Sequence, residues 1–172
     1  TTEKTKTSNF SINPKVGYEL SEKLAVGAGV VFGSSSISTP LPTKNVTTTV
    51  GITPFARYYI TNGEKFKVFA EAELELNQES EKNTSGGTTV DGDKIGNTIF
   101  GITPNISYAL TDKFELEASL NFLNVRYSSS TTTTVVTGIG ETKDKNNSFN
   151  FGVNSGNVFT SGFLTIGFIY KL

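Results

Sequence analysis

The chain has 172 residues, and its 15 Lys and Arg against 16 Asp and Glu give a net charge of −1. It contains no Cys and no His, which excludes a disulfide scaffold, a thiolate metal site and the usual general base near neutral pH. We therefore expect no cofactor and no metal. The balanced charge also argues against a nucleic-acid partner, because nucleic-acid binding requires a basic surface.

The apolar composition is unusual for a water-soluble protein. Hydrophobic residues make up only 35% of the chain, yet it has 13 Phe and 6 Tyr. Soluble cores normally rely on Leu, Ile and Val with fewer aromatic residues. No stretch approaches the roughly 18 consecutive apolar residues of a transmembrane helix.

Seven segments alternate apolar residues with small or polar ones. Strict alternation over ten or more residues predicts strands, because successive strand side chains point to opposite faces. No segment shows a competing period of 3.6 residues, so the sequence predicts an all-β fold. In chain order, the predicted strands are residues 10–20, 24–33, 46–60, 66–77, 100–110, 114–127 and 163–172.

A short motif recurs in three of these strands. It reads Ile-Asn-Pro at residues 12–14, and Ile-Thr-Pro at 52–54 and 102–104, with a Tyr four residues after each Pro. The repeat indicates one hairpin unit that is used three times. Because proline lacks a backbone donor, we expect a bulge or kink at each of the three sites.

Short and long connections alternate between the predicted strands. The tight connections are residues 21–23, 61–65 and 111–113, and the long polar ones are roughly 34–45, 78–94 and 128–146. This arrangement is typical of an antiparallel up-and-down transmembrane β-barrel, in which one end is trimmed and the other elaborated.

The face opposite the apolar one indicates the environment of the barrel. It mixes many small residues with a few charges, as the cramped interior of a narrow barrel requires. Tyr and Phe gather near the strand ends, which is where aromatic girdles lie. We therefore expect the apolar face to contact lipid. The alternative is a soluble β-barrel that binds an apolar ligand inside.

The last predicted strand alternates to the final residue and resembles the C-terminal insertion signal of outer-membrane barrels, with Leu172 where Phe is usual. The resemblance implies contact with the barrel-assembly machinery and a final strand that ends in the periplasm. The tight turns would then be periplasmic and the long loops extracellular. The signal comprises Leu164, Ile166, Phe168, Tyr170 and Leu172.

Seven strands conflict with the even number found in bacterial single-chain barrels, since an open sheet leaves unpaired edges in lipid. Either a first strand lies upstream of Thr1, or residues 147–172 hold two strands. A turn around residues 156–162 could separate those two strands, because the alternation changes parity there. We expect the upstream strand, which gives an eight-stranded barrel.

Three strand–turn–strand units resemble the small bacterial outer-membrane β-barrel family of OmpX/OmpA-like architecture. The resemblance implies a single barrel domain over residues 1–172, an opening strand before the first unit, and an outer-membrane setting with contacts to lipid and lipopolysaccharide. The units read INPKVGYELSEKLAVGAG (12–29), ITPFARYYITNGEKFKVFAEAEL (52–74) and ITPNISYALTDKFELEASL (102–120).

Several enzymes are small outer-membrane barrels, but their chemistry relies on a His, which this chain lacks, so we assign no catalytic residue and expect no enzyme activity. The charged residues on the second face predict an ion-paired plug, here termed the lumen charge network. If the lumen conducts, its acidic excess favours cations. The network comprises Lys15, Glu19, Arg57, Lys67, Glu71, Glu73, Glu75, Glu115, Glu117 and Lys171.

The leading functional hypothesis is a non-enzymatic integral outer-membrane barrel that is structural or presents its long loops to a partner. Three alternatives stay open. They are a subunit or accessory of a larger outer-membrane complex, a narrow cation-preferring porin, and the soluble ligand-binding barrel.

Overall fold

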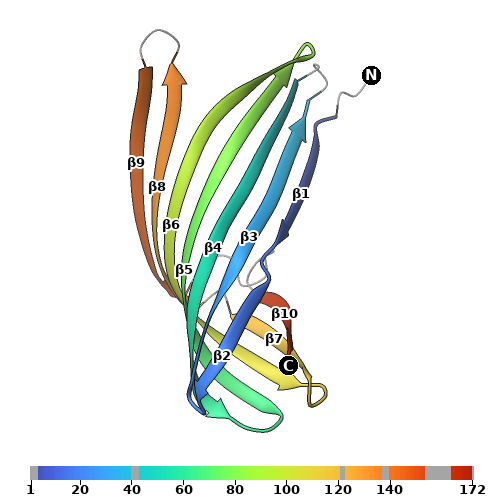
Figure 1. Ribbon diagram of the computed structural model, residues 1–172, viewed down its shortest axis with the longest axis vertical. Coiled ribbons are helices and arrows are strands. Elements are labelled where there is room, and N and C mark those ends of the chain that lie inside the picture. Colours follow the sequence, from blue (N-terminus) through green and yellow to red (C-terminus); the bar gives the residue numbers. More distant parts are fainter. Residues whose placement is uncertain (1–3, 40–42, 121–122, 137–139, 154–163, 172) are drawn as a thin grey trace.

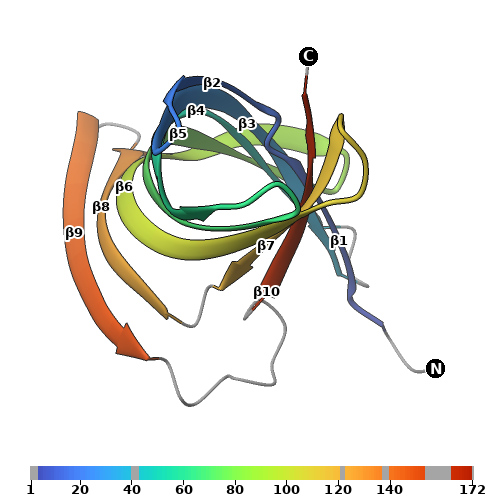
Figure 2. The ribbon, with the colours of Figure 1, turned by 90° about the horizontal axis from the view of Figure 1, so that it is seen from below.

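The computed structural model describes residues 4–39, 43–120, 123–136, 140–153 and 164–171 (Figure 1). These residues form one antiparallel sheet that curls into a half-barrel (Figure 2). Within the described residues, no helix has the length and apolar composition needed to cross a membrane. The strands are β1 (Lys6–Ile12), β2 (Lys15–Ser21), β3 (Leu24–Ser38), β4 (Thr43–Asn62), β5 (Phe66–Ser85), β6 (Thr88–Ala109), β7 (Phe114–Leu120), β8 (Leu123–Val136), β9 (Gly140–Val153) and β10 (Leu164–Tyr170).

Several of these strands lie end to end, so the sheet consists of seven lines of strand. β1 and β2 both pair with β3, while β7 and β8 both pair with β6. β9 pairs with β8, and β10 pairs with β7. The seven lines follow the seven predicted segments in up-and-down order, which confirms the predicted fold class.

The C-terminal part of the chain does not form a hairpin between β9 and β10. β9 is antiparallel to β8 and β10 is antiparallel to β7, so β9 and β10 run in the same direction. The change of parity between Phe149 and Phe168 therefore does not mark a turn between two crossing strands. The same change occurs in the neighbouring line. Odd-numbered Tyr127 on β8 pairs with Phe100, whereas even-numbered Leu116 on β7 pairs with Tyr108, and Phe149 and Phe168 pair with Tyr127 and Leu116 in turn. Both lines therefore shift parity at the same level. The turn at 156–162, which belonged to the alternative of two strands in residues 147–172, lies outside the described residues.

The repeated prolines lie at interruptions of the sheet. Pro14 separates β1 from β2, and Pro104 lies where β6 exchanges β8 for β7 as its partner. Next to Pro54, the ladder between β4 and β5 omits two residue pairs. Since proline cannot donate to the ladder, each copy of the motif lies where pairing with one neighbour is interrupted. The bulges predicted at the prolines are not found there: the register shifts lie at Glu19/Ser21, Tyr59/Thr61 and Ser80/Lys82.

The long connections are not loops, which corrects the expectation from the sequence. β3 to β6, β8 and β9 continue through the polar segments as paired strands. In Figure 1 these extensions form the upper part of the sheet, at the end opposite the short turns. Their Thr and Ser residues favour extended structure. The β5–β6 hairpin closes through Gly86 and Gly87, whose φ angles of 57° and 85° suit a tight two-residue turn.

Both margins of the sheet lack a neighbouring strand among the described residues. β1 and β2 pair only with β3, β9 pairs only with β8, and β10 pairs only with β7. The line β1–β2 and the line β9–β10 run in the same direction, so they are not antiparallel neighbours.

Candidate functional site

The convex face of the sheet carries apolar side chains that are strongly exposed. Val16, Tyr18 and Phe168 are each more than 70% exposed, and they occupy the outward rows of the pairing pattern. Such a continuous apolar exterior is incompatible with water, because soluble monomers expose only small apolar patches. The members of this apolar band include Val26, Val30, Phe32, Val50, Ile52, Tyr58, Phe66, Leu76, Phe100, Ile102, Tyr108, Phe114, Ile166 and Tyr170.

The upper boundary of the apolar band gives the tilt of the strands. Following directly paired residues across the sheet places the boundary at Phe10 on β1 and at Phe149 on β9, which lies six residues lower, or three outward positions. Six residues correspond to about 20 Å along a strand, and the six strand spacings between β1 and β9 to about 29 Å. The strands therefore tilt by roughly 35° from the membrane normal, as in transmembrane barrels.

The concave face is polar and buried, so the distribution of polar and apolar side chains is the inverse of that in a soluble protein, which buries apolar residues and exposes polar ones. Phe69 is fully buried, and it lies among buried polar groups such as Thr53 and Asn105. Lys67, Glu71 and Glu115 are also buried there. Buried charges of this kind are tolerated only when they are paired, so their partners define the site.

Arg57 lies at the centre of the lumen charge network. Its Nε is 2.5 Å from Glu71 Oε2, and its Nη1 is 2.9 Å from Glu117 Oε2. Lys15 Nζ lies 2.8 Å from Glu71 Oε1 and also pairs with Glu73. Two cations and three carboxylates from β2, β4, β5 and β7 thus meet across the lumen.

Aromatic rings complete this centre. The Arg57 guanidinium lies 5.1 Å from the centroid of Phe55 and 4.8 Å from that of Phe69, which are cation–π distances. Gly27 provides the space for Phe55, since a Cβ at that position would lie 2.5 Å from the ring and 2.2 Å from the Val16 carbonyl oxygen. Neither Phe is among the lumen residues predicted from the sequence, although both occupy odd-numbered, inward positions two residues from Arg57 or Glu71.

A second cluster lies nearer the tight turns. Glu115 pairs with Lys171 and, at 3.1 Å, with Lys67, while Ser107 donates a hydrogen bond to it at 3.2 Å. Lys67 also lies 3.9 Å from Glu19 on β2. Glu115 Oε1 accepts no hydrogen bond of good geometry, so the two lysines compensate its charge. The cluster links β2, β5 and β7 to the end of β10.

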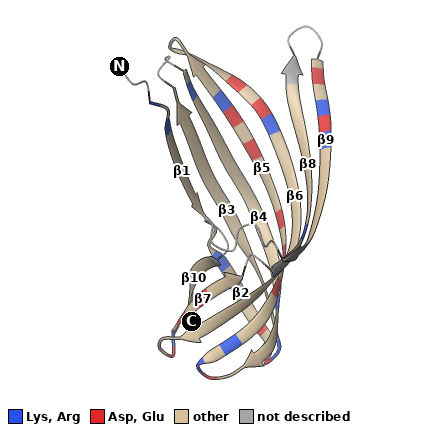
Figure 3. Ribbon diagram, turned by 180° about the vertical axis from the view of Figure 1, so that it is seen from behind, with Lys and Arg blue, Asp and Glu red and all other residues tan. Residues whose placement is uncertain are grey.

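Of the predicted network, Glu75 differs from the other members because it forms no ion pair among the described residues. It instead accepts a hydrogen bond from Asn77. Asn97 donates to both Asn77 and Glu79, so amides and carboxylates continue upward from the charge clusters. Acidic residues recur along β5 in Figure 3.

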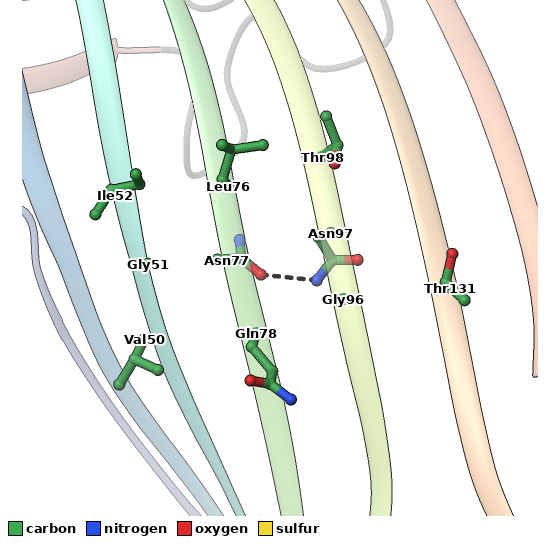
Figure 4. A pocket seen from close by; sticks show the side chains of 10 residues that line it. All are labelled: Val50, Gly51, Ile52, Leu76, Asn77, Gln78, Gly96, Asn97, Thr98 and Thr131. Carbon is green, nitrogen blue, oxygen red and sulfur yellow. Dashed lines mark hydrogen bonds between the residues drawn. The ribbon is translucent and has the colours of Figure 1, made fainter. Parts of the chain in front are cut away.

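Two hollows border this region. One, of about 490 Å³, lies above the Arg57 centre and is lined by Lys15, Glu71, Glu73 and Glu75, together with Arg126. The other, of about 630 Å³, is a shallow depression across β4, β5, β6 and β8, where Asn77 and Asn97 bond to each other (Figure 4). In the part of the chain with defined placement, no three His, Cys, Asp or Glu side chains are grouped to hold a metal ion.

The predicted C-terminal signal lies on β10 and shares the convex face. Ile166, Phe168 and Tyr170 are exposed there, and the Tyr170 ring lies 5.2 Å from that of Phe114. Leu164 opens β10, whereas Leu172 lies outside the described residues.

Comparisons with known proteins agree with this geometry. The sequence profile of the outer membrane protein beta-barrel domain matches residues 1–155. No curated protein and no solved structure matches the chain significantly. The match covers most of the chain, and the exposed apolar band and polar lumen are those of a membrane barrel. The chain therefore belongs to the outer-membrane protein β-barrel domain family, and it is an integral protein of the outer membrane.

Proposed function

We propose that the protein is a single-domain, non-enzymatic barrel whose lumen is closed by the lumen charge network and whose long hairpins are presented to a partner. The observation that carries the closed lumen is the set of ion pairs that join Arg57 to Glu71 and Glu117, with Phe55 and Phe69 against the guanidinium. Side chains that bridge a narrow barrel leave no continuous aqueous path.

Recordings from the purified protein in planar bilayers test this proposal. We expect no stable conductance steps, because opening a path would separate buried ion pairs. Stable steps in wild-type protein would refute the plug.

A narrow cation-preferring channel is the second candidate. Five of the inward positions of β5 near and above the Arg57 centre are acidic, and two of them, Glu75 and Glu79, contact amides rather than cations. Acidic linings favour cations. The same recordings separate the two candidates, because only this one predicts cation-selective steps that weaken in Glu75→Gln.

The proposed orientation places the tight turns in the periplasm and the long hairpins outside. The short turns and the long hairpins lie at opposite ends of the sheet, as in bacterial barrels. Because the chain has no Cys, single substitutions report on exposure without background. In intact cells we expect an impermeant maleimide to label Thr88→Cys but not Asp112→Cys, and the reverse pattern would invert the orientation.

An eighth strand stays a prediction, supported by the two margins of the sheet. Lines β1–β2 and β9–β10 run in the same direction, so one strand of opposite direction between them would pair with both. Unpaired backbone groups in lipid each cost several kcal/mol. Recognition of β10 by the barrel-assembly machinery is likewise proposed from its apolar alternation.

A further inference from the structure

Two charged side chains that face the hollow above the Arg57 centre have no ion-pair partner among the described residues. Glu75 accepts a hydrogen bond from Asn77 but pairs with no cation, although every Lys and Arg of the chain lies in the described part. Arg126 pairs with no described acid, and the only acidic side chain outside the described residues is Glu3, before β1. Both side chains line the hollow of about 490 Å³.

The pairing register places these two charges on either side of β6. Glu73, Gly101 and Arg126 lie in one row across β5, β6 and β8. Gly101 has no side chain, so it leaves open the space between its two neighbours in the row. Glu73 pairs with Lys15, and Glu75 lies one inward position above it. Two strand spacings and two residues along a strand place the Cα atoms of Glu75 and Arg126 about 12 Å apart along the sheet.

The hollow lies at the depth of the apolar band. Arg126 precedes Tyr127 and Glu75 precedes Leu76, and both of these neighbours are exposed on the convex face. Ionisable side chains within membrane-spanning segments are costly, and they commonly mark a binding site or a transport path. A guanidinium and a carboxylate that face one hollow without partners therefore indicate a ligand that carries both complementary charges.

We propose that this hollow binds a small zwitterion, with the ligand's carboxylate on Arg126 and its ammonium group on Glu75. Such a ligand spans roughly 9 Å between the two side chains, from two hydrogen bonds of about 2.9 Å and about 3 Å between its own charged groups. The side chains on the concave face of a curled sheet converge, so this span fits a Cα separation of about 12 Å. A free α-amino acid has the required spacing of charges.

The rest of the hollow suits such a ligand. Hydroxyl groups of Thr103 and Ser119 and the amide of Asn105 line it, and Ile99 adds an apolar surface. Its volume lies within the range of small-molecule sites. The Arg57 centre lies below it, so a ligand enters from the side of the long hairpins. The inference therefore rests on the proposed closed lumen, which provides the floor of the site.

Binding is tested by heteronuclear NMR and titration calorimetry of the folded protein in maltoside micelles, whose headgroup is uncharged. The chain contains two arginines, Arg57 and Arg126, so arginine-selective labelling gives one Nε–H signal from the site and one internal control. The probes are L-alanine, propionate, which lacks the ammonium group, and ethylamine, which lacks the carboxylate. The variants are Glu75→Gln and Arg126→Gln, with Glu141→Gln and Lys143→Gln on exposed β9 as charge-matched controls.

We expect L-alanine to shift the Arg126 signal and to leave the Arg57 signal in place. Each site variant should bind L-alanine at least about 10-fold more weakly, since it loses a charge-assisted hydrogen bond, and the controls should bind like the wild type. Propionate and ethylamine should also bind at least about 10-fold more weakly, because each leaves one charge of the site unpaired.

Equal binding of propionate or ethylamine, an equal loss in the controls, or an Arg126 signal that L-alanine does not move would overturn the inference. Planar-bilayer recordings of the same preparation separate this outcome from failure of the proposed function. Stable conductance steps refute the closed lumen, whereas a closed barrel that does not bind L-alanine refutes the site alone.

Discussion

Removing the Arg57 guanidinium tests whether the lumen is held by buried ion pairs. Arg57→Gln leaves Glu117 without its cation among the described residues, while Glu71 keeps Lys15 at 2.8 Å. One uncompensated buried carboxylate therefore remains rather than two. Breaking a buried pair from one side costs about 3–5 kcal/mol, and the retained Lys15 contact places the expected loss of unfolding free energy near 3 kcal/mol.

The assay is urea unfolding in lipid vesicles, followed by heat-modifiable migration and circular dichroism. Adding Glu117→Gln removes the orphaned charge, so the double variant should regain about 1–2 kcal/mol. Arg126→Gln is the matched control, because the exposed Arg126 forms no ion pair within the described residues. A loss below about 0.5 kcal/mol in Arg57→Gln, or no recovery in the double variant, would refute the reasoning.

Two further predictions concern the fold. Gly27→Ala should destabilise the barrel by about 2–4 kcal/mol, because the new Cβ overlaps the Val16 carbonyl oxygen and the Phe55 ring. Gly96→Ala is the control, since a Cβ at Gly96 meets open space. Equal unfolding curves for the two variants would contradict the packing of Gly27 against Phe55. Ala72→Arg places a charge in the middle of the apolar band of β5 and should cost about 2–4 kcal/mol in vesicles, whereas Ser80→Arg, two outward positions above Leu76, should cost at most about 1 kcal/mol. Equal losses at these two positions would show that the convex face does not meet lipid.

The lumen also explains why this chain has few of the features of a soluble core. Lipid already surrounds the convex face, so apolar residues gain nothing from moving inward, and the interior must instead satisfy its own polar groups. Glu71 and Glu115 are each shared between two cations. Sharing lets a few side chains join strands that are distant in the sheet, which stabilises the curvature as well as filling the space.

The sequence by itself determined that the fold is an antiparallel up-and-down sheet, and it determined which face of the alternating segments points outward. Alternation has a period of two, and strand side chains alternate with the same period, so the parity of Val26, Tyr58 or Phe168 identifies the convex face without knowledge of the pairing. The tight turns followed from the same pattern, because each interrupts an alternating segment with only a few polar residues. The charged positions of the lumen followed as a set, since they occupy the opposite parity.

Only the tertiary structure decided how these parts combine. Polar segments such as residues 78–94 lack the alternation that marks a strand in lipid, so their pairing into long hairpins depends on partners distant in sequence. The parity shift between β7 and β8 is likewise a property of the register with β6. Parity places Arg57 on the inside, but the curvature of the sheet selects Glu71, Glu117 and the two Phe rings as its neighbours, because residues 60 positions apart meet only when the sheet closes around them.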